Sequence, residues 1–395
     1  MPAAGLRLRR LWPPAGFVPL AWRNLLANKP RLLRSGGGIG FAVLLMLMQL
    51  GFDRAFFNAA LEIIRRLDGD IFLQSASKYR FATRDPFPHR ELDAARAVTG
   101  VASVWPLYAD WFDVFWRNPA DGKTFLVRTL AFDPNHPVLR LPGLEGNLDE
   151  LRQPDTAMID RRARRFLGMD LTVSESELNG AKVYVVGSFA LGPDFESDGT
   201  VLIGERAFAQ LLPRPGGGPP DVEVGVVKVG PGTDPVSVQR AIRSALPPEI
   251  AVLTKGELLE LERKFQAEVS SAGPIFAMGT VVGFVVGMLI AYQIIYTDLA
   301  DQLPQYATMK AMGYRNRYLV RVVLEQAALS GLAGWIPAWL LSLLLYSVVG
   351  AVALLPMRMT WEITLISLLL TLGMCLISAV LAVRRVIAAD PAEVF

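Results

Sequence analysis

The sequence predicts an α-helical membrane protein with four transmembrane helices and a large α+β extracytoplasmic domain inserted between helices 1 and 2. Hydrophobic residues make up 52% of the 395 residues, and the mean hydropathy of +0.34 is high for a soluble protein. The apolar residues gather in four runs, each near the roughly 20 residues that a helix needs to cross a bilayer. A long stretch of water-soluble composition separates the first run from the second.

These runs divide the chain into segments with expected bounds. In order they are a cytoplasmic amphipathic segment at 1–35, transmembrane helix 1 at 36–57, the extracytoplasmic domain with its stalk helices at 58–274, transmembrane helix 2 at 275–297, a polar cytoplasmic loop at 298–321, transmembrane helix 3 at 322–349, a short periplasmic loop at 350–361, transmembrane helix 4 at 362–383 and a cytoplasmic tail at 384–395.

Basic residues predict the orientation of the spans. Residues 1–35 carry Lys and Arg but no acidic residue, and the fourth run ends at Arg384 and Arg385. By the positive-inside rule both termini lie in the cytoplasm, while the long inserted domain can be exported regardless of its charge. A signal peptide is excluded because no small-residue cleavage site follows the first run. Residues 20–33 fit either a helix lying on the anionic inner leaflet or a simple topogenic flank.

Short apolar runs punctuated by Gly and Pro predict strands in the inserted domain. We expect strands at 70–73, 101–107, 124–132, 182–188, 200–203, 221–229 and 250–253. Helical periods at 88–98 and 235–246 each lead into a strand, which predicts an α+β subdomain with a β-rich insertion between its two helix–strand units. Residues 56–67 and 255–271 also have a helical period and predict a two-helix stalk, with Val269 on the apolar stripe of the second helix.

Small residues are concentrated on the first and third runs. They are Gly36, Gly37, Gly38 and Gly40 on the first run, and Ser330, Gly331, Ala333 and Gly334 on the third. Such residues let helix backbones approach closely. They are compatible with a homodimer but do not prove one.

The residues predict no catalytic, cofactor or metal site. The single cysteine, Cys375, lies in an apolar run, which excludes an internal disulfide and a multi-cysteine metal site. Two histidines, His89 and His136, argue against a zinc site. The net charge of +3 suggests no nucleic-acid partner.

Three local patterns resemble functional motifs but lack required residues. Gly122-Lys123-Thr124 is not a phosphate loop, because Arg117 stands where that motif needs a glycine. Ser188 lacks the second glycine of a nucleophile elbow. The acidic cluster of Asp194, Glu196 and Asp198 predicts a solvated turn, since the spacing of a calcium loop does not continue.

The polar loop at 298–321 is short and net basic. Pro304 suits the first turn of a helix and Gly313 is a C-cap signal, so the loop predicts a short helix. A helix tethered at both ends to membrane spans cannot move without moving them. We interpret it as the docking point of a cytoplasmic partner; a purely topogenic loop is the alternative.

This loop resembles that of the FtsX-like, MacB-type ABC transporter permeases. The matching parts are the polar helix at 302–309, the turn Lys310-Ala311-Met312-Gly313, the basic step from Arg315 to Arg321, and the early Glu of Leu324-Glu325-Gln326-Ala327. The start Ala21-Trp22-Arg23-Asn24-Leu25 and the end Asp390-Pro391-Ala392-Glu393 are also similar to the family's ends, and are closest to the DevC-type permeases.

The resemblance implies the non-catalytic permease subunit of an ABC-type exporter in the inner membrane, acting as a homodimer. It implies that ATP and Mg are bound by a separate ATPase subunit, because this chain lacks the ATPase domain fused in MacB. The ATPase groove would grip the coupling helix at Gln302, Gln305, Tyr306, Met309, Lys310 and Gly313. Further implied partners are a periplasmic adaptor protein, an outer-membrane TolC-like channel and membrane lipids. The DevC-type similarity implies a lipid or glycolipid-like cargo.

Two other functions in the family stay open. A division-type regulator would transmit ATPase motion to a periplasmic cell-wall hydrolase, and a lipoprotein-release permease would act on lipoproteins. The large inserted domain favours export or lipid extraction over the regulator. A membrane enzyme is disfavoured because no nucleophile, base and orienting residue can be assembled.

Overall fold

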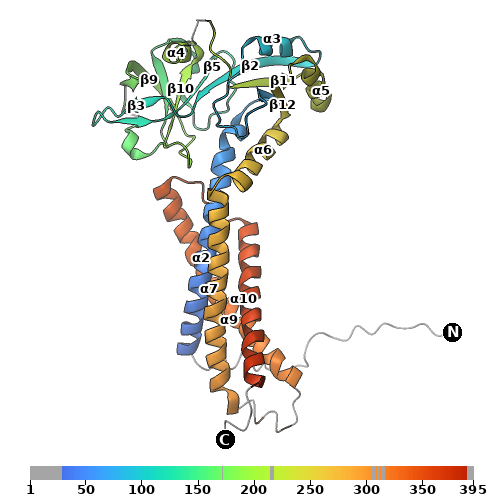
Figure 1. Cartoon of the computed structure of the whole chain (residues 1–395). Helices are drawn as coiled ribbons and strands as arrows, with labels where there is room; N and C mark the ends of the chain where they lie inside the picture. Colours follow the sequence, from blue (N-terminus) through green and yellow to red (C-terminus); the bar gives the residue numbers. More distant parts are fainter. Residues whose placement is uncertain are drawn as a thin grey trace, which may run out of the picture. The chain divides into compact units, whose positions relative to one another are not determined.

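The computed structural model describes residues 29–170, 172–213, 218–304, 308, 312 and 316–388 (Figure 1). The chain divides into two compact units. The helical unit comprises Met1–Gly51, Ala277–Tyr346 and Met359–Phe395, and the sheet unit comprises Phe52–Phe276 and Ser347–Arg358. Helices α2 (Lys29–Arg66) and α7 (Ala272–Asp301) contribute residues to both units.

Four of the described helices are long and apolar enough to cross a membrane. Besides α2 and α7 they are α9 (Asn316–Ala353) and α10 (Trp361–Ala388). Their apolar spans run over Gly36–Arg66, Gly273–Asp301, Asn316–Ala353 and Trp361–Arg384. The predicted fold class of four membrane helices with an inserted α+β domain is confirmed.

Glycines bring the backbones of α2 and α9 into contact in the helical unit. A Cβ atom added to Gly40 would lie 3.0 Å from the carbonyl oxygen of Gly334, and one added to Gly36 would lie 3.5 Å from that of Ala333. Such close approach gains dispersion energy where the hydrophobic effect cannot drive helices together. Because these glycines contact one another within the chain, they do not by themselves indicate a homodimer.

Side-chain hydrogen bonds link the remaining helices of this unit. Ser378 Oγ on α10 donates to the carbonyl of Met288 on α7 at 2.7 Å. Trp335 Nε1 on α9 donates to Ser367 Oγ on α10 at 3.1 Å, and Tyr346 of α9 donates its hydroxyl hydrogen to the carbonyl of Leu47 on α2. In a bilayer such bonds are each worth about 0.6–2 kcal/mol.

The first half of the sheet unit is formed by the two predicted helix–strand units and a strand before each. Its elements are β1 (Ile71–Ser75), α3 (Arg90–Arg96), β2 (Val101–Asp110), β11 (Val224–Val229), α5 (Pro235–Ala245) and β12 (Ile250–Thr254). The strands lie in the antiparallel order β12-β1-β11-β2. A β-α-β-β-α-β chain order of this kind is a known supersecondary arrangement. The predicted subdomain is therefore present.

The β-rich insertion lies between β2 and β11. It contains β3 (Phe115–Arg117), β4 (Thr124–Leu126), β5 (Arg128–Phe132), β6 (Glu145–Gly146), the 3-10 helix η1 (Leu148–Arg152), β7 (Thr156–Asp160), η2 (Arg165–Leu167), β8 (Glu175–Leu178), β9 (Ala181–Phe189), β10 (Thr200–Gly204) and α4 (Glu205–Leu211). The long strand β2 joins both halves, because its first residues pair with β11 and its last with β5.

Several sequence expectations for this insertion need correction. The single strand expected at 124–132 is two strands, because β4 pairs with β3 while β5 pairs with β2 and β10. The sequence analysis missed β3, β6, β7, β8 and α4. Strand β7 is buried throughout between β10 and β9, so its apolar and polar residues do not alternate as in a half-exposed strand.

Both faces of the first half of the sheet are covered by helices. Ile71 and Leu73 of β1 belong to a core with Leu92 of α3 and Ile242 of α5. The residue between them, Phe72, belongs to a second core with residues of α2 and α6 (Lys255–Lys264). Successive residues of a strand point to opposite faces, so β1 must be apolar throughout. Figure 1 shows α3 and α5 on one side of these strands and α6 on the other.

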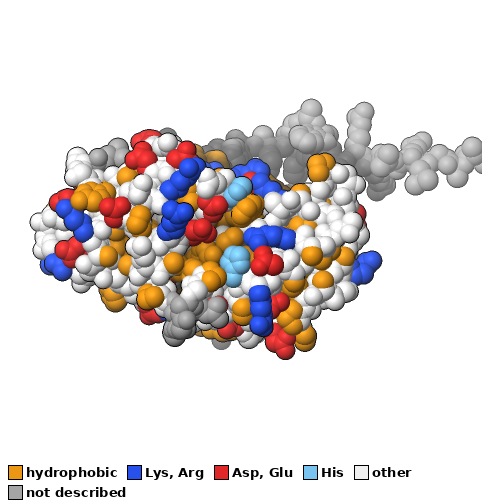
Figure 2. Space-filling view, turned by 90° about the horizontal axis from the view of Figure 1, so that it is seen from above, with side chains coloured by type: hydrophobic (Ala, Val, Ile, Leu, Met, Phe, Trp, Pro, Cys, Tyr) orange, Lys and Arg blue, Asp and Glu red, His pale blue; other side chains and the backbone are white. Residues whose placement is uncertain are grey.

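The surface in Figure 2 shows acidic and basic side chains interspersed, with histidine side chains beside a hydrophobic patch. No single sign of charge dominates this face. A mixed surface of this kind lacks the continuous basic stripe that marks nucleic-acid binding.

Candidate functional site

The structure describes only one of the predicted docking residues. Gln302, in the turn after α7, is 6% exposed, and its backbone N–H donates to the carbonyl of Leu299 at 3.2 Å. Gln305, Tyr306, Met309, Lys310 and Gly313 lie outside the described residues. ATPase docking at this loop therefore stays a prediction.

A second candidate site lies where the stalk helices meet the sheet, inside the sheet unit. We call it the stalk junction. It comprises the part of α2 from Phe52 onward, α6, the π-helix η3 (Phe265–Val269), the start of α7 up to Phe276, and loop residues Phe81, Trp111, Phe112 and 194–197. Both stalk helices continue along the chain into candidate membrane spans.

The two stalk helices are fastened to each other and to the sheet. Lys255 Nζ donates to the carbonyls of Arg65 and Leu67, at 3.1 and 2.8 Å, and so satisfies free acceptors at the end of α2. Burial lowers the pKa of this ammonium group. Thr254 and Glu257 form a capping box that starts α6. Leu61 of α2 and Leu258 of α6 then share one core with the sheet.

The second stalk helix is interrupted, contrary to the continuous helix expected over 255–271. After α6 the backbone forms η3 and then becomes extended at Ser270, before α7 begins. The π-turn changes which side chains face inward, so Val269 is 66% exposed and lies off the predicted apolar stripe. Gly273 is needed here, because a Cβ atom would lie 2.7 Å from the carbonyl oxygen of Gln266.

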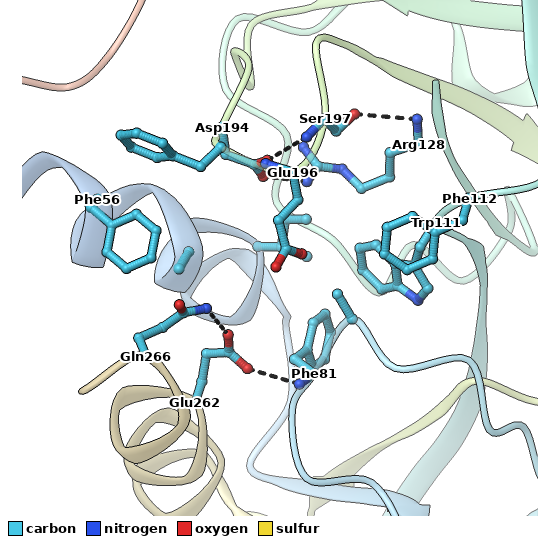
Figure 3. A pocket seen from close by; sticks show the side chains of 14 residues that line it. Phe56, Phe81, Trp111, Phe112, Arg128, Asp194, Glu196, Ser197, Glu262 and Gln266 are labelled. Atoms are coloured by element: carbon cyan, nitrogen blue, oxygen red, sulfur yellow. Dashed lines mark hydrogen bonds and ion pairs between the residues drawn. The ribbon is translucent and has the colours of Figure 1, made fainter. Parts of the chain in front are cut away.

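An enclosed pocket of about 40 Å³ lies in the middle of the stalk junction (Figure 3). Aromatic rings form much of its wall: Phe56 stands 4.9 Å from Phe195 between centroids, and Phe81 stands 5.6 Å from Trp111. The Glu196 carboxylate points into the pocket from the opposite loop (Figure 3). The stalk and the insertion therefore meet through an aromatic wall that contains acidic groups.

The acidic groups of this enclosed pocket are partnered. Glu262, 4% exposed, accepts from the backbone N–H of Phe81 at 2.8 Å and from Gln266 Nε2 at 2.7 Å. Glu196 accepts from Arg80 Nη1 at 2.6 Å, and the Arg80 guanidinium lies over the ring of Phe112. Burial raises the pKa of Glu262 and of Glu196. The carboxylates of Glu262 and Glu196 are thus held by specific hydrogen bonds, and that of Glu196 also by an ion pair.

A second cavity, of about 370 Å³, opens on the other side of the Arg128–Asp194 ion pair, which lines both. We call it the arginine pocket. Its lining includes Asn58, Glu62, Arg65 and Arg66 of α2, Arg162, the loop 191–194, and Leu354, Pro356 and Arg358 of the α9–α10 loop. All these residues belong to the sheet unit.

The turn expected at Asp194, Glu196 and Asp198 is present, and the side chains of Glu196 and Asp198 are 37% and 45% exposed, whereas that of Asp194 is largely buried. The sequence did not predict that each carboxylate pairs with an arginine: Asp194 with Arg128, Glu196 with Arg80, and Asp198 with Arg164. The arginines come from distant parts of the sequence, so no local pattern could reveal them. Among the described residues no group of three His, Cys, Asp or Glu could hold a metal ion.

Sequence reasoning also missed Glu262 and Gln266. A signal was present, because both lie on the same helix face as Leu258, at steps of four residues. Two buried polar groups on an otherwise apolar face indicate a hydrogen-bonded contact with another element.

The comparison with protein families concerns the part of the chain that holds the last three candidate membrane spans. Residues 272–391 match the family model described as FtsX-like permease C-terminal. No curated protein sequence matches the chain.

Two solved structures resemble the inserted domain weakly. The periplasmic region of MacB from Actinobacillus actinomycetemcomitans is 10% identical, with 52% of this chain and 96% of that chain covered and a TM-score of 0.36. The extracellular domain of the noncanonic ABC-type transporter YknZ from Gram-positive bacteria is 12% identical, with 47% and 99% covered and a TM-score of 0.32. Likeness at this level carries no functional argument. The family match spans the part of the chain that holds α7, α9 and α10, so this part is similar to the C-terminal region of FtsX-like permeases.

Proposed function

We propose that this chain is the membrane subunit of an ATP-driven exporter and that a separate ATPase subunit docks on residues 302–313. The match to the FtsX-like permease family supports this proposal, because it covers the last three spans together with the loop between α7 and α9. The loop joins two membrane helices, so a partner that moves it also moves α7 and α9.

The stalk junction supports a mechanical role for the inserted domain in this proposal. Leu61, Ile64 and Leu258 are almost fully buried against Phe72 of the sheet. Each such side chain contributes about 1.5–3 kcal/mol when buried. The parts of α2 and α6 that pack against the sheet would therefore move with it as one body.

We expect this movement to pivot at Ser270, where the backbone is extended between η3 and α7. A helix interior transmits rotation rigidly, whereas an extended residue between η3 and α7 can absorb a change in backbone angles. We propose that ATP-driven displacement of α7 pivots at this break and displaces α6 together with the sheet. The cargo in this proposal is lipid or glycolipid-like, and a homodimer, a periplasmic adaptor and an outer-membrane channel complete the exporter, as the similarity to DevC-type permeases implies.

The docking step is tested by co-purification with candidate ABC ATPase subunits expressed together with the chain. Met309→Asp places a charge in the expected buried contact, and Lys310→Glu reverses the charge at its rim. We expect each variant to retain at least tenfold less ATPase than the unmodified chain, since a buried charge or a lost charged contact costs several kcal/mol at an interface. Arg117→Glu, on β3 of the inserted domain, is the control and should retain the ATPase fully. Unchanged retention by Met309→Asp and Lys310→Glu would contradict docking at this loop.

A further inference from the structure

The arginine pocket is walled by segments that adjoin membrane spans in the sequence. Asn58, Glu62 and Arg65 lie at the C-terminal end of the candidate span Gly36–Arg66, and Leu354 and Arg358 lie in the short loop between α9 and α10. A helix needs about 20 residues to cross a bilayer, so a crossing that begins at Gly36 would end near residue 55. Residues just beyond that point would lie close to the lipid headgroups.

The charges of this pocket are unbalanced. It holds five arginines, namely Arg65, Arg66, Arg128, Arg162 and Arg358, but only two acidic residues, Glu62 and Asp194. Glu62 pairs with Arg66 at 2.6 Å, and Asp194 pairs with Arg128. No carboxylate of the described residues lies within 4.0 Å of the guanidinium groups of Arg65, Arg162 or Arg358, so three positive charges remain for a ligand.

The side of the pocket that carries Arg162 is held in place. The buried Asp160 carboxylate accepts the backbone N–H groups of Arg162, Leu191 and Gly192, at 3.0, 3.1 and 2.6 Å. One carboxylate thus fixes both the segment that presents Arg162 and the loop beside it. A binding site needs this kind of support, since side chains on loose loops lose affinity to disorder.

The opposite side shows backbone strain. Leu354 adopts φ +57°, a left-handed conformation that costs a non-glycine residue roughly 1–2 kcal/mol. Strain of this kind persists only where the surroundings impose it, and it concentrates at functional positions. It shapes the loop that carries Arg358.

We propose that the arginine pocket binds the phosphate-bearing headgroup of an anionic membrane lipid. The planar guanidinium forms paired hydrogen bonds with phosphate oxygens, and three unpaired arginines supply the charge. The cavity of about 370 Å³ is many times the roughly 30 Å³ taken up by a water molecule. Apolar residues in its lining, Ile63, Leu191, Leu354 and Pro356, suit the glycerol and the first acyl carbons.

A soluble anion shares the phosphate chemistry, but the position of the walls next to membrane spans favours a lipid. The inference deepens the proposed function by naming the headgroup class of a lipid cargo. Binding itself needs neither ATP nor the ATPase subunit. Failure of lipid binding is therefore separate from failure of ATPase docking.

The test uses the full chain in nanodiscs of zwitterionic phosphatidylcholine, titrated with fluorescent phosphatidylglycerol. We expect the double variant Arg162→Ala/Arg358→Ala to bind phosphatidylglycerol at least tenfold more weakly than the unmodified chain. Arg358→Lys, which keeps the charge but loses the planar fork, should be intermediate. Arg117→Ala, an exposed arginine paired with Glu177, is the matched control and should bind normally. Met309→Asp should also bind normally.

Three outcomes would overturn the proposal. The first is equal phosphatidylglycerol binding by the double variant and the unmodified chain. The second is binding of fluorescent phosphatidylcholine as strong as that of phosphatidylglycerol, since it would show no selection for net negative charge. The third is competition by glycerol phosphate or inorganic phosphate at the same concentration as the lipid, which would assign the pocket to a soluble anion.

Discussion

Two cavities of the sheet unit share the Arg128–Asp194 ion pair but differ in how their charges are satisfied. In the enclosed pocket of the stalk junction, Glu262 and Glu196 each have a close donor, and aromatic rings fill the remaining wall. In the larger arginine pocket, the guanidinium groups of Arg65, Arg162 and Arg358 have no carboxylate of the described residues within 4.0 Å, because Glu62 and Asp194 pair with Arg66 and Arg128.

This difference separates structural from ligand-binding chemistry. Buried groups that are fully partnered stabilise one arrangement, and removing one partner costs free energy. Unpaired exposed charges contribute little to folding but attract a ligand of the opposite charge. Variants of the two cavities should therefore differ most in thermal stability.

Replacing Arg128 should have the largest effect, because this residue belongs to both cavities. Its side chain is 4% exposed, pairs with Asp194 and donates to Thr200 Oγ1 at 2.9 Å. Breaking a buried ion pair from one side costs about 3–5 kcal/mol. We expect Arg128→Ala to lower the unfolding temperature of the full chain in detergent strongly. Arg117→Ala removes an exposed ion pair and should lower the free energy of unfolding by less than about 1 kcal/mol. Equal shifts of the unfolding temperature for Arg128→Ala and Arg117→Ala would contradict the structural role of the buried pair.

Gly273→Ala should come next, because its Cβ would lie 2.7 Å from the carbonyl of Gln266 beside the break in the stalk. Overpacking of this kind costs about 1–3 kcal/mol. The control is Gly256→Ala in α6, where a Cβ meets no atom within 4 Å and a better helix former should add up to about 1 kcal/mol. Opposite shifts in unfolding temperature are expected. A stabilising Gly273→Ala would show that the stalk is not tightly packed there.

The buried Glu262 should make the stability of the enclosed pocket depend on pH. Burial raises the pKa of Glu262 above its ordinary value of 4.5, so the folded protein binds this proton more tightly than the unfolded chain. The resulting stability is fully present below about pH 4.5 and is lost as the pH rises through the raised pKa. Glu262→Gln stays neutral throughout. The difference in unfolding temperature between Glu262→Gln and the unmodified chain should therefore shift in favour of the variant as the pH increases.

A suitable control for this titration is Glu177→Gln, because Glu177 lies on the surface in an exposed pair with Arg117. Its difference from the unmodified chain should stay nearly constant over the same pH range. If Glu262→Gln behaved in the same way as this control, the carboxylate of Glu262 would not be held in a desolvated site.

Arg162→Ala and Arg358→Ala should have the smallest effect on stability. Both side chains are exposed and have no ion-pair partner among the described residues, so each variant should change the free energy of unfolding by no more than about 0.5 kcal/mol. Unfolding temperatures measured without added anionic lipid would check this. A large destabilisation by either variant would show that its arginine stabilises the fold, which would argue against a role reserved for ligand binding.

Much of the architecture could be predicted from the sequence because its signals are local. A membrane span is recognised by the length and polarity of one continuous run, and four helices in the described part of the chain meet this requirement. The two helix–strand units were found in the same way, from apolar periods that neighbouring residues carry. The split of residues 124–132 into β4 and β5 was not predictable, since it depends on pairing with strands far away in the chain.

Only the tertiary structure brings together the residues that line the two cavities. Arg65, Arg128, Arg162 and Arg358 come from four separate segments, and nothing in their local sequence indicates that they line one pocket. The ion pairs of the carboxylates at 194–198 were not predictable, because their arginine partners are distant in the sequence. Coulomb energy and desolvation depend on distance in space and on burial, which only folding sets. The candidate spans and the two helix–strand units were therefore predictable from the sequence, while the charges available to a ligand followed from the fold.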